Sequence, residues 1–208
     1  MHVLGQFAVV DQPDRFVWIR GFADMAARRR GLDGFYGGPF WQARRDTANA
    51  MIREHHDVHL LRPLGPLDAT TGVGSVERRW VEEPGALPPA AGLIVVDFLR
   101  TAPGALTSLV DAFERRVRPA LVERGHRVLG HFTAELAPNG YPRLPVIQDP
   151  DLLVVLSAYP DREGYARRRA PDGRDPLGQE WPAAARPHVT SLLLRPTARS
   201  LIRYPDDH

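Results

Sequence analysis

The sequence has no cysteine and no lysine, and the missing cysteine excludes several kinds of site. Without cysteine there is no disulfide framework, no thiolate metal site and no thiol nucleophile. All 27 basic residues are arginines, which with 20 prolines and 18 glycines indicates a GC-rich bacterial genome rather than a functional choice. No window approaches the roughly eighteen apolar residues of a membrane span. The first ten residues also lack the basic and apolar regions of a secretory signal, so we expect a cytoplasmic protein without a membrane partner.

Excess charge of one sign is also missing. The formal net charge is only +2 over 208 residues. Arginines do cluster at 28–30, 115–116 and 167–169, but acidic residues surround each cluster and no aromatic residues for base stacking are interleaved. These clusters are typical of solvated helix faces. We therefore expect no nucleic-acid partner.

What the chain does have is an internal repeat. The opening MHVLGQF returns as RVLGHF at 127–132, and DVHLLRP at 57–63 returns as TSLLLRP at 190–196. Each copy contains two strands ahead of a helical stretch and the LLRP strand after it, and Asp24 and Asp161 are placed to cap the helices. The strands predicted before the helices are 3–10 and 15–22 in the first copy, and 128–136 and 152–159 in the second.

Only the second copy has a strand and a helix at its beginning. LIVVDFLR at 93–100 predicts a strand, and apolar residues at three- and four-residue steps predict an amphipathic helix over 105–124, with a kink or restart at Pro119. The second copy thus has the order β-α-β-β-α-β, which is ferredoxin-like, and the first copy has only β-β-α-β. We expect one half at 1–64, a linker at 65–92 and the other half at 93–208.

Several stretches resemble the NIPSNAP family in its bacterial tandem form. They are FVWIRGFADMAARRR, FYGGPFWQARRDTANA, VRPAL, NGYPRLPV and LLLRPTARSL, and the resemblance covers 2–63 and 92–203. It implies the dimeric α/β-barrel superfamily, in which two ferredoxin-like units pack sheet to sheet around a pocket. That superfamily includes cofactor-free monooxygenases, small isomerases, haem-dependent enzymes and proteins without known chemistry. The resemblance supplies no catalytic residues, and a fold alone does not fix a function.

The fold class predicted is therefore α+β, with two ferredoxin-like halves forming an α/β barrel whose first half is N-terminally incomplete. The missing strand would lie centrally, between the third and fourth strands of that half, and its loss would leave backbone groups unpaired. Two repairs are expected alternatives. Either the reading frame extends upstream of Met1, or a substitute strand fills the space, from a second chain in a strand-exchanged homodimer or from SVERRWVEE at 75–83.

Strand alternation sorts the side chains by face. We expect Val17, Ile19 and Gly21 to pack under helices and the alternate set to point into the barrel. The predicted barrel face forms an apolar, aromatic wall with a few polar groups, which is typical of a small-molecule pocket. Its proposed substrate-binding residues are Phe16, Trp18, Phe22, Gln6, Glu135, Asp97 and Tyr159, with Leu153, Val155, Ser157 and Thr133 beside them.

Arg20 and His131 are the predicted catalytic pair on that face. A buried guanidinium needs an anionic ligand or an internal partner, so Arg20 holds a ligand or pairs with Asp97 or Glu135. His131 has a free pKa near neutrality and is the candidate acid–base group, with a purely structural role as the alternative. We expect both to border one cavity.

Two further segments attract attention. His55, His56 and His59 lie close together, but the strand must begin near Val58, so we expect exposed turn histidines and no metal. The proline-rich insertion 139–151 would hold Tyr141 and Arg143 at the barrel mouth, as a recognition loop or as a strap over a sheet edge.

Two functions follow from this sequence. The first is a cofactor-independent enzyme that binds and transforms a small, largely apolar, aromatic or anionic metabolite by isomerisation, cyclisation or cofactor-free oxygenation. The second is a non-catalytic small-molecule-binding protein or protein-interaction scaffold. An open cavity reaching Arg20 and His131 would favour the first, and a filled barrel interior would favour the second.

Overall fold

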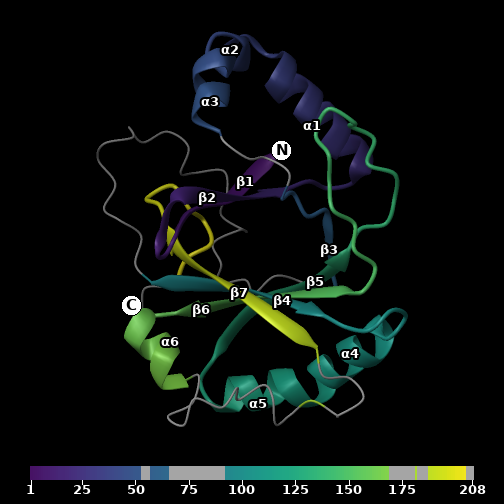
Figure 1. Cartoon of the computed structure of the whole chain (residues 1–208), viewed down its shortest axis with the longest axis vertical. Helices are drawn as coiled ribbons and strands as arrows, with labels where there is room; N and C mark the ends of the chain where they lie inside the picture. The colour runs from purple at the N-terminus through teal and green to yellow at the C-terminus, as the bar shows by residue number, and fades with distance from the viewer. Residues whose placement is uncertain (53–56, 66–91, 169–180, 182–186, 205–208) are drawn as a thin grey trace.

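The structure is a computed structural model that describes residues 1–52, 57–65, 92–168, 181 and 187–204 (Figure 1). It is a mixed α+β structure built on one curled, antiparallel, seven-stranded sheet. The strands are β1 (His2–Val9), β2 (Gln12–Gly21), β3 (Leu61–Pro63), β4 (Leu93–Arg100), β5 (Arg127–Ala134), β6 (Leu152–Tyr159) and β7 (His188–Pro196). The helices are α1 (Met25–Gly37), α2 (Pro39–Gln42), α3 (Arg45–Met51), α4 (Leu106–Ala112), α5 (Arg118–Glu123) and α6 (Arg162–Arg168), and a π-helical turn, η3 (Phe113–Val117), joins α4 to α5. None of the described helices has the length and apolar character needed to cross a membrane.

The local signals in the sequence explain where the helices begin and break. The Asp24 carboxylate accepts a hydrogen bond from the Ala27 amide at 2.6 Å, and the Asp161 carboxylate accepts one from the Gly164 amide at 2.5 Å, which confirms both predicted caps. The GFYGGP stretch divides the first helical region at Gly38. Pro119, which has no N–H to donate, follows the wider π-helical turn instead of ending the helix.

The strands lie in the order β2-β1-β7-β4-β6-β5-β3, and each pair of neighbours is antiparallel. Figure 1 shows α1–α3 on one side of the curled sheet and α4–α6 on the other. The two copies of the repeat pair reciprocally. Phe7 of β1 lies opposite Pro196 of β7, and its counterpart Phe132 of β5 lies opposite Pro63 of β3.

The other residues of these two pairings keep the same register. Ala8 lies opposite Arg195, and Thr133 lies opposite Arg62. Both β1 and β5 also carry a bulge just before the glycine of the repeated phrase, at Leu4 and Leu129. The echo in the sequence therefore marks two strands with the same bulge and the same cross-sheet partners. Most of the predicted linker 65–92, including 75–83, lies outside the described residues.

The core divides by face. A cluster made only of strand residues and the C-terminal segment occupies the concave side of the sheet, with Phe7, Ile94 and Leu194 fully buried at 0% exposure. On the convex side, Leu153 and Val155 pack with residues of α4, η3 and α5. Along each strand, residues that face the concave side alternate with residues that face the convex side, as strand geometry requires.

The predicted faces are wrong, because Val17 and Ile19 pack against the core cluster on the concave side. The alternate set, including Trp18 and Arg20, therefore points outward. Alternation yields two sets of residues but does not say which set is inside. In β6 all eight residues are buried, so neither face of that strand was marked as the outer one.

Candidate functional site

Arg20 lies on the outer side of β2, beneath α1. Its Nη1 donates to the Tyr36 hydroxyl at 3.5 Å, and its guanidinium lies 5.9 Å from the Trp18 ring centre. Neither Asp97 nor Glu135, the two predicted internal partners, contacts it in the described part of the chain. Trp18 and Phe16, which were expected to line a pocket, are 46% and 53% exposed.

His131 lies on the outer face of β5 and contacts the helix layer. Its Nε2 is 3.0 Å from Glu114 Oε1, and its ring packs against Phe113 at 5.2 Å between centres. The contacts of His131 and Arg20 come from different helices, η3 and α1. The structure does not bring the predicted catalytic pair together.

The other predicted binding residues also lie away from the concave face. Asp97 accepts from the Ser191 hydroxyl, and Tyr159 contacts His126 and Tyr165 near α6. Gln6 lies opposite Trp18, and the Glu135 carboxylate accepts from the Ala137 amide at 2.8 Å. Phe22 is partly buried just after β2, and Thr133 and Ser157 are buried. None of these contacts joins Arg20 to His131.

The insertion 139–151 has only a single bridge residue, Ile147, and straps two parts of the first copy. Arg28 of α1 is only 3% exposed, and its Nη1 donates to the backbone and side-chain oxygens of Asn139 at 2.6 and 2.8 Å. Burial, and then the nearby Arg20 charge, lowers the pKa of Arg28. Tyr141 is buried and stacks on Tyr36, with ring centres 6.0 Å apart, and Arg143 is exposed. Ile147 exchanges backbone hydrogen bonds with Val58 and Leu60, so the insertion is joined to the segment just before β3 as well as to α1.

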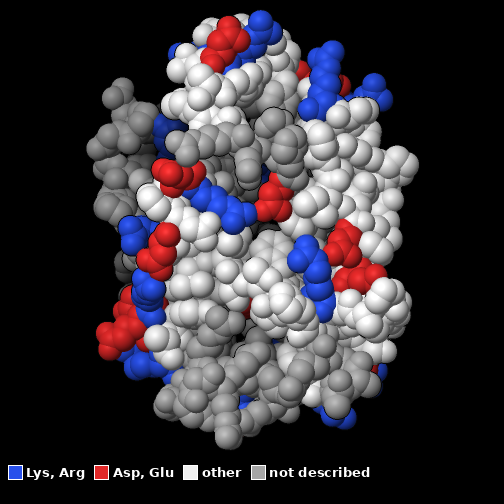
Figure 2. Space-filling model, in the orientation of Figure 1, with Lys and Arg blue, Asp and Glu red and all other residues white. Residues whose placement is uncertain are grey.

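Three arginines of the clusters lie on solvated helix faces, as expected, whereas Arg28 is buried. Arg29, Arg115 and Arg167 each pair with a carboxylate one turn away on their own helix. Basic and acidic side chains are interspersed on the face seen in Figure 2.

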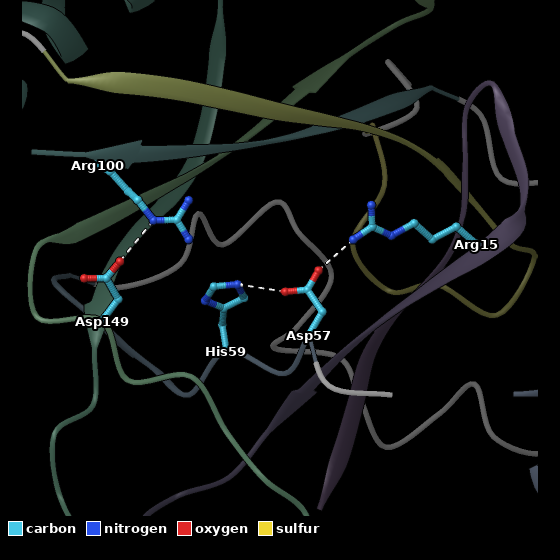
Figure 3. Close-up of polar contacts among 5 residues, drawn as sticks. All are labelled: Arg15, Asp57, His59, Arg100 and Asp149. Atoms are coloured by element: carbon cyan, nitrogen blue, oxygen red, sulfur yellow. Dashed lines mark hydrogen bonds and ion pairs between the residues drawn. The ribbon is translucent and has the colours of Figure 1, made fainter. Parts of the chain in front are cut away.

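The polar group that the sequence analysis missed is His59. It was expected in an exposed turn, but its side chain is only 12% exposed and its ring lies 5.0 Å from that of Phe98, on the concave side. His59 Nε2 is 3.2 Å from Asp57 Oδ1, and Asp57 Oδ2 accepts from Arg15 Nη2 at 2.6 Å (Figure 3). The buried Nδ1 of His59 has no hydrogen-bond partner within the described structure.

This geometry defines the state of the imidazole. Desolvation is the largest influence and lowers the pKa of His59, the Asp57 carboxylate opposes this effect, and the Arg100 charge adds to it. The ring is therefore neutral near pH 7. With Asp57 accepting from Nε2–H, the lone pair resides on Nδ1. A neutral, oriented histidine with an unpaired ring nitrogen can accept a proton from a group that comes within hydrogen-bond reach of that nitrogen.

Arg100 and Asp149 complete the group. Arg100 Nε donates to Asp149 Oδ2 at 3.1 Å, and the free end of the Arg100 guanidinium points toward His59 (Figure 3). Arg15 lies near the start of β2, His59 precedes β3 and Arg100 ends β4. In this antiparallel sheet those positions meet at one end of the concave face, which we name the mouth cluster: Arg15, Asp57, His59, Arg100 and Asp149.

Period-two alternation could have found this cluster. Arg15 has the parity of Val17 and Ile19, and Arg100 has the parity of Val96 and Phe98. When the concave-facing residues of β2 and β4 are assigned correctly, Arg15 and Arg100 are assigned to the concave face with them.

No group of three or more potential metal ligands occurs among the described residues, and His55 and His56 fall outside them. A search of protein-family models and of curated proteins found no match to the chain.

Proposed function

We propose that the chain is an enzyme that moves a proton on a small, largely apolar molecule bound at the mouth cluster, without a metal. The observation that carries this proposal is the unpaired, buried Nδ1 of His59, whose other nitrogen is fixed by Asp57. His59 Nδ1 accepts the proton from carbon or oxygen, and Asp57 stabilises the imidazolium that results. The guanidinium of Arg100 binds the carbonyl or carboxylate of the ligand and stabilises the negative charge that develops there.

Isomerisation fits this set of groups best. In that reaction His59 returns the same proton to another atom of the substrate, so atoms and charge balance without an oxidant. The concave face beyond the mouth is filled by side chains such as Phe7 and Ile94, so the ligand lies at the mouth against Phe98 rather than deep in the sheet. An aromatic or aliphatic carbonyl compound is the expected substrate class.

The proposal replaces His131 and Arg20 by His59 and Arg100 as the groups that touch the substrate. We also propose that the chain is NIPSNAP-like and cytoplasmic, with two ferredoxin-like halves in one α/β barrel. The strand order β7-β4-β6-β5 of the second copy supports this fold, since its strands occur along the chain as first β4, second β5, third β6 and fourth β7.

The test is loss of α-protons from small 2-oxo acids and aldehydes in deuterated buffer, with phenylpyruvate as the first probe and proton NMR as the readout. We expect His59→Gln to slow exchange by about 100- to 10,000-fold, the usual contribution of a general base. His131→Gln is the matched control, because His131 is also a buried histidine next to a carboxylate. Exchange that survives in His59→Gln and is lost in His131→Gln would refute the assignment.

A non-catalytic scaffold is the second candidate, and the filled concave face is the observation that favours it. Absence of exchange across the whole set of carbonyl compounds, with no binding detected at His59, would favour this alternative.

A further inference from the structure

The two outer strands of the sheet, β2 and β3, have one open edge each within the described structure. Seven strands are joined by antiparallel pairings throughout, from β2 at one end to β3 at the other. An odd number of strands in such a series makes the first and last run in the same direction. β2 and β3 therefore cannot pair with each other in the antiparallel manner of the other neighbours. One more strand, antiparallel to both, would continue the pattern across the opening.

The second copy of the repeat shows what occupies the corresponding position. β2 corresponds to β6, because Val17 lies opposite Phe7 and Val154 lies opposite Phe132. β3 corresponds to β7 through the matched prolines, Pro63 and Pro196. Between β6 and β7 lies β4, which is antiparallel to both. In the described part of the chain, β2 and β3 have the corresponding outer neighbours, β1 and β5, but no strand lies between them.

The side chains next to the opening suit an apolar strand. Val17, Ile19 and Leu61 present apolar groups on the concave side and are only partly buried. In the second copy, β4 fills this position with Ile94, Val96 and Phe98 on the concave side. On its convex side β4 presents Leu93, Val95 and Leu99 together with Asp97, which accepts from Ser191, so both faces of β4 are mainly apolar.

The outer face of β2 is also less covered than that of its counterpart. Phe16 and Trp18 are 53% and 46% exposed, whereas the corresponding Leu153 and Val155 are 0% and 3% exposed. Arg15, near the start of β2, pairs with Asp57, which precedes β3, and these two side chains are 44% and 60% exposed. An ion pair so exposed contributes little to stability.

We propose that the opening between β2 and β3 binds one extended, apolar segment of a partner polypeptide by strand addition to both edges. The segment runs antiparallel to both strands and is about eight residues long, since β4, Leu93–Arg100, fills the corresponding position. Main-chain hydrogen bonds supply the affinity, and alternate side chains contact the concave cluster and the exposed Phe16 and Trp18. The opening shares the Arg15–Asp57 pair with the mouth cluster, but strand addition to β2 and β3 does not depend on proton transfer by His59.

The probe is a synthetic peptide with the sequence of β4, LIVVDFLR, extended by three arginines for solubility. Hydrogen exchange measured by mass spectrometry follows segments containing β2, β3 and β6 of the full chain. Without peptide, β2 should exchange at least tenfold faster than β6, because β6 is paired on both sides. With peptide, exchange in β2 and β3 should slow together while β6 stays unchanged.

The matched control peptide replaces the valine equivalent to Val96 by proline, which removes a donor and disfavours a central strand. It should protect neither edge. Protection of β2 equal to that of β6 in the free chain would overturn the proposal, as would a lack of response to saturating LIVVDFLR peptide. Protection that rises with protein concentration alone would assign the opening to a second copy of this chain and overturn the assignment to a separate partner.

Discussion

The repeated LGxF phrase has a packing reason that a pair of substitutions can test. In β1 the ring of Phe7 lies across Gly5, so that a Cβ added at Gly5 would meet ring atoms at 2.3 Å. Phe7 itself is fully buried in the concave cluster. Gly5→Ala should therefore displace the Phe7 ring, and the damage should depend on that ring being present.

The expected losses of stability follow from the packing at Gly5 and Phe7. Overpacking of this kind costs about 1–3 kcal/mol, and loss of a buried phenylalanine side chain costs about 3–5 kcal/mol. If the two costs were independent, the double substitution Gly5→Ala with Phe7→Ala would lose about 4–8 kcal/mol, by summing the two ranges. We expect instead a loss close to that of Phe7→Ala alone, because the added methyl group then enters the space left by the ring.

The assay is urea denaturation followed by circular dichroism, with the free energy of unfolding extrapolated to water for the four proteins of the cycle. Gly34→Ala is the control, because nothing lies within 4 Å of a Cβ at Gly34 in helix α1. That change should stabilise the protein by about 0.5–1 kcal/mol. Additive losses from Gly5→Ala and Phe7→Ala would refute the packing explanation.

Three further predictions concern other parts of the structure. In urea denaturation, Val17→Ala should cost about 1–2 kcal/mol, because Val17 packs on the concave cluster, and Phe16→Ala should cost less than about 0.5 kcal/mol, because Phe16 is exposed. A larger loss from Phe16→Ala than from Val17→Ala would show that Phe16, and not Val17, faces the core. Asn139→Ala should cost about 1–3 kcal/mol, because it removes one acceptor of the buried Arg28, and an unchanged midpoint would show that this contact does not anchor the strap. Burial lowers the pKa of His59 in the folded protein, so below pH 6.5, the ordinary pKa of histidine, the unfolded state binds more protons than the folded state. The free energy of unfolding should therefore fall as the pH drops below 6.5 and stay level above it. His59→Phe should weaken this acid dependence, and the same pH profile in both proteins would contradict it.

Local features of the fold were predictable from short stretches of sequence. The strands 93–100 and 152–159 coincide with β4 and β6. Asp24 and Asp161 cap their helices because a carboxylate next to free helical amides has few alternatives. These features depend on neighbours in the chain, which the sequence displays directly.

The faces of the strands depend on what packs against them, and here the sequence was misleading. Trp18 and Phe16 are the largest apolar residues of β2, yet they lie outside, while the smaller Val17 and Ile19 face the concave cluster. Side-chain size does not decide this choice, because the inner space is already filled by Phe7 and its neighbours from other strands. Every predicted site residue chosen by face inherited the error.

The mouth cluster was missed for a second reason. His59 lies only two residues from Asp57 and in a stretch that resembles a turn, so its contact with Phe98 of β4 could not be read from nearby residues. Its burial results from strand pairings between positions far apart in the chain, such as β3 with β5. Arg100 and Asp149 meet for the same reason.

The most direct test of the account is the protonation state of His59 itself. Nitrogen-15 NMR of imidazole-labelled protein, with His59 assigned by comparison with His59→Gln, measures both its pKa and its tautomer. We predict a pKa below 6.5 and a neutral ring that carries its proton on Nε2, as burial and the Asp57 contact require. A pKa of 6.5 or higher would contradict the desolvation of the imidazole, and a neutral ring protonated on Nδ1 would contradict the assignment of Nδ1 as the base, so either result would contradict the proposed function.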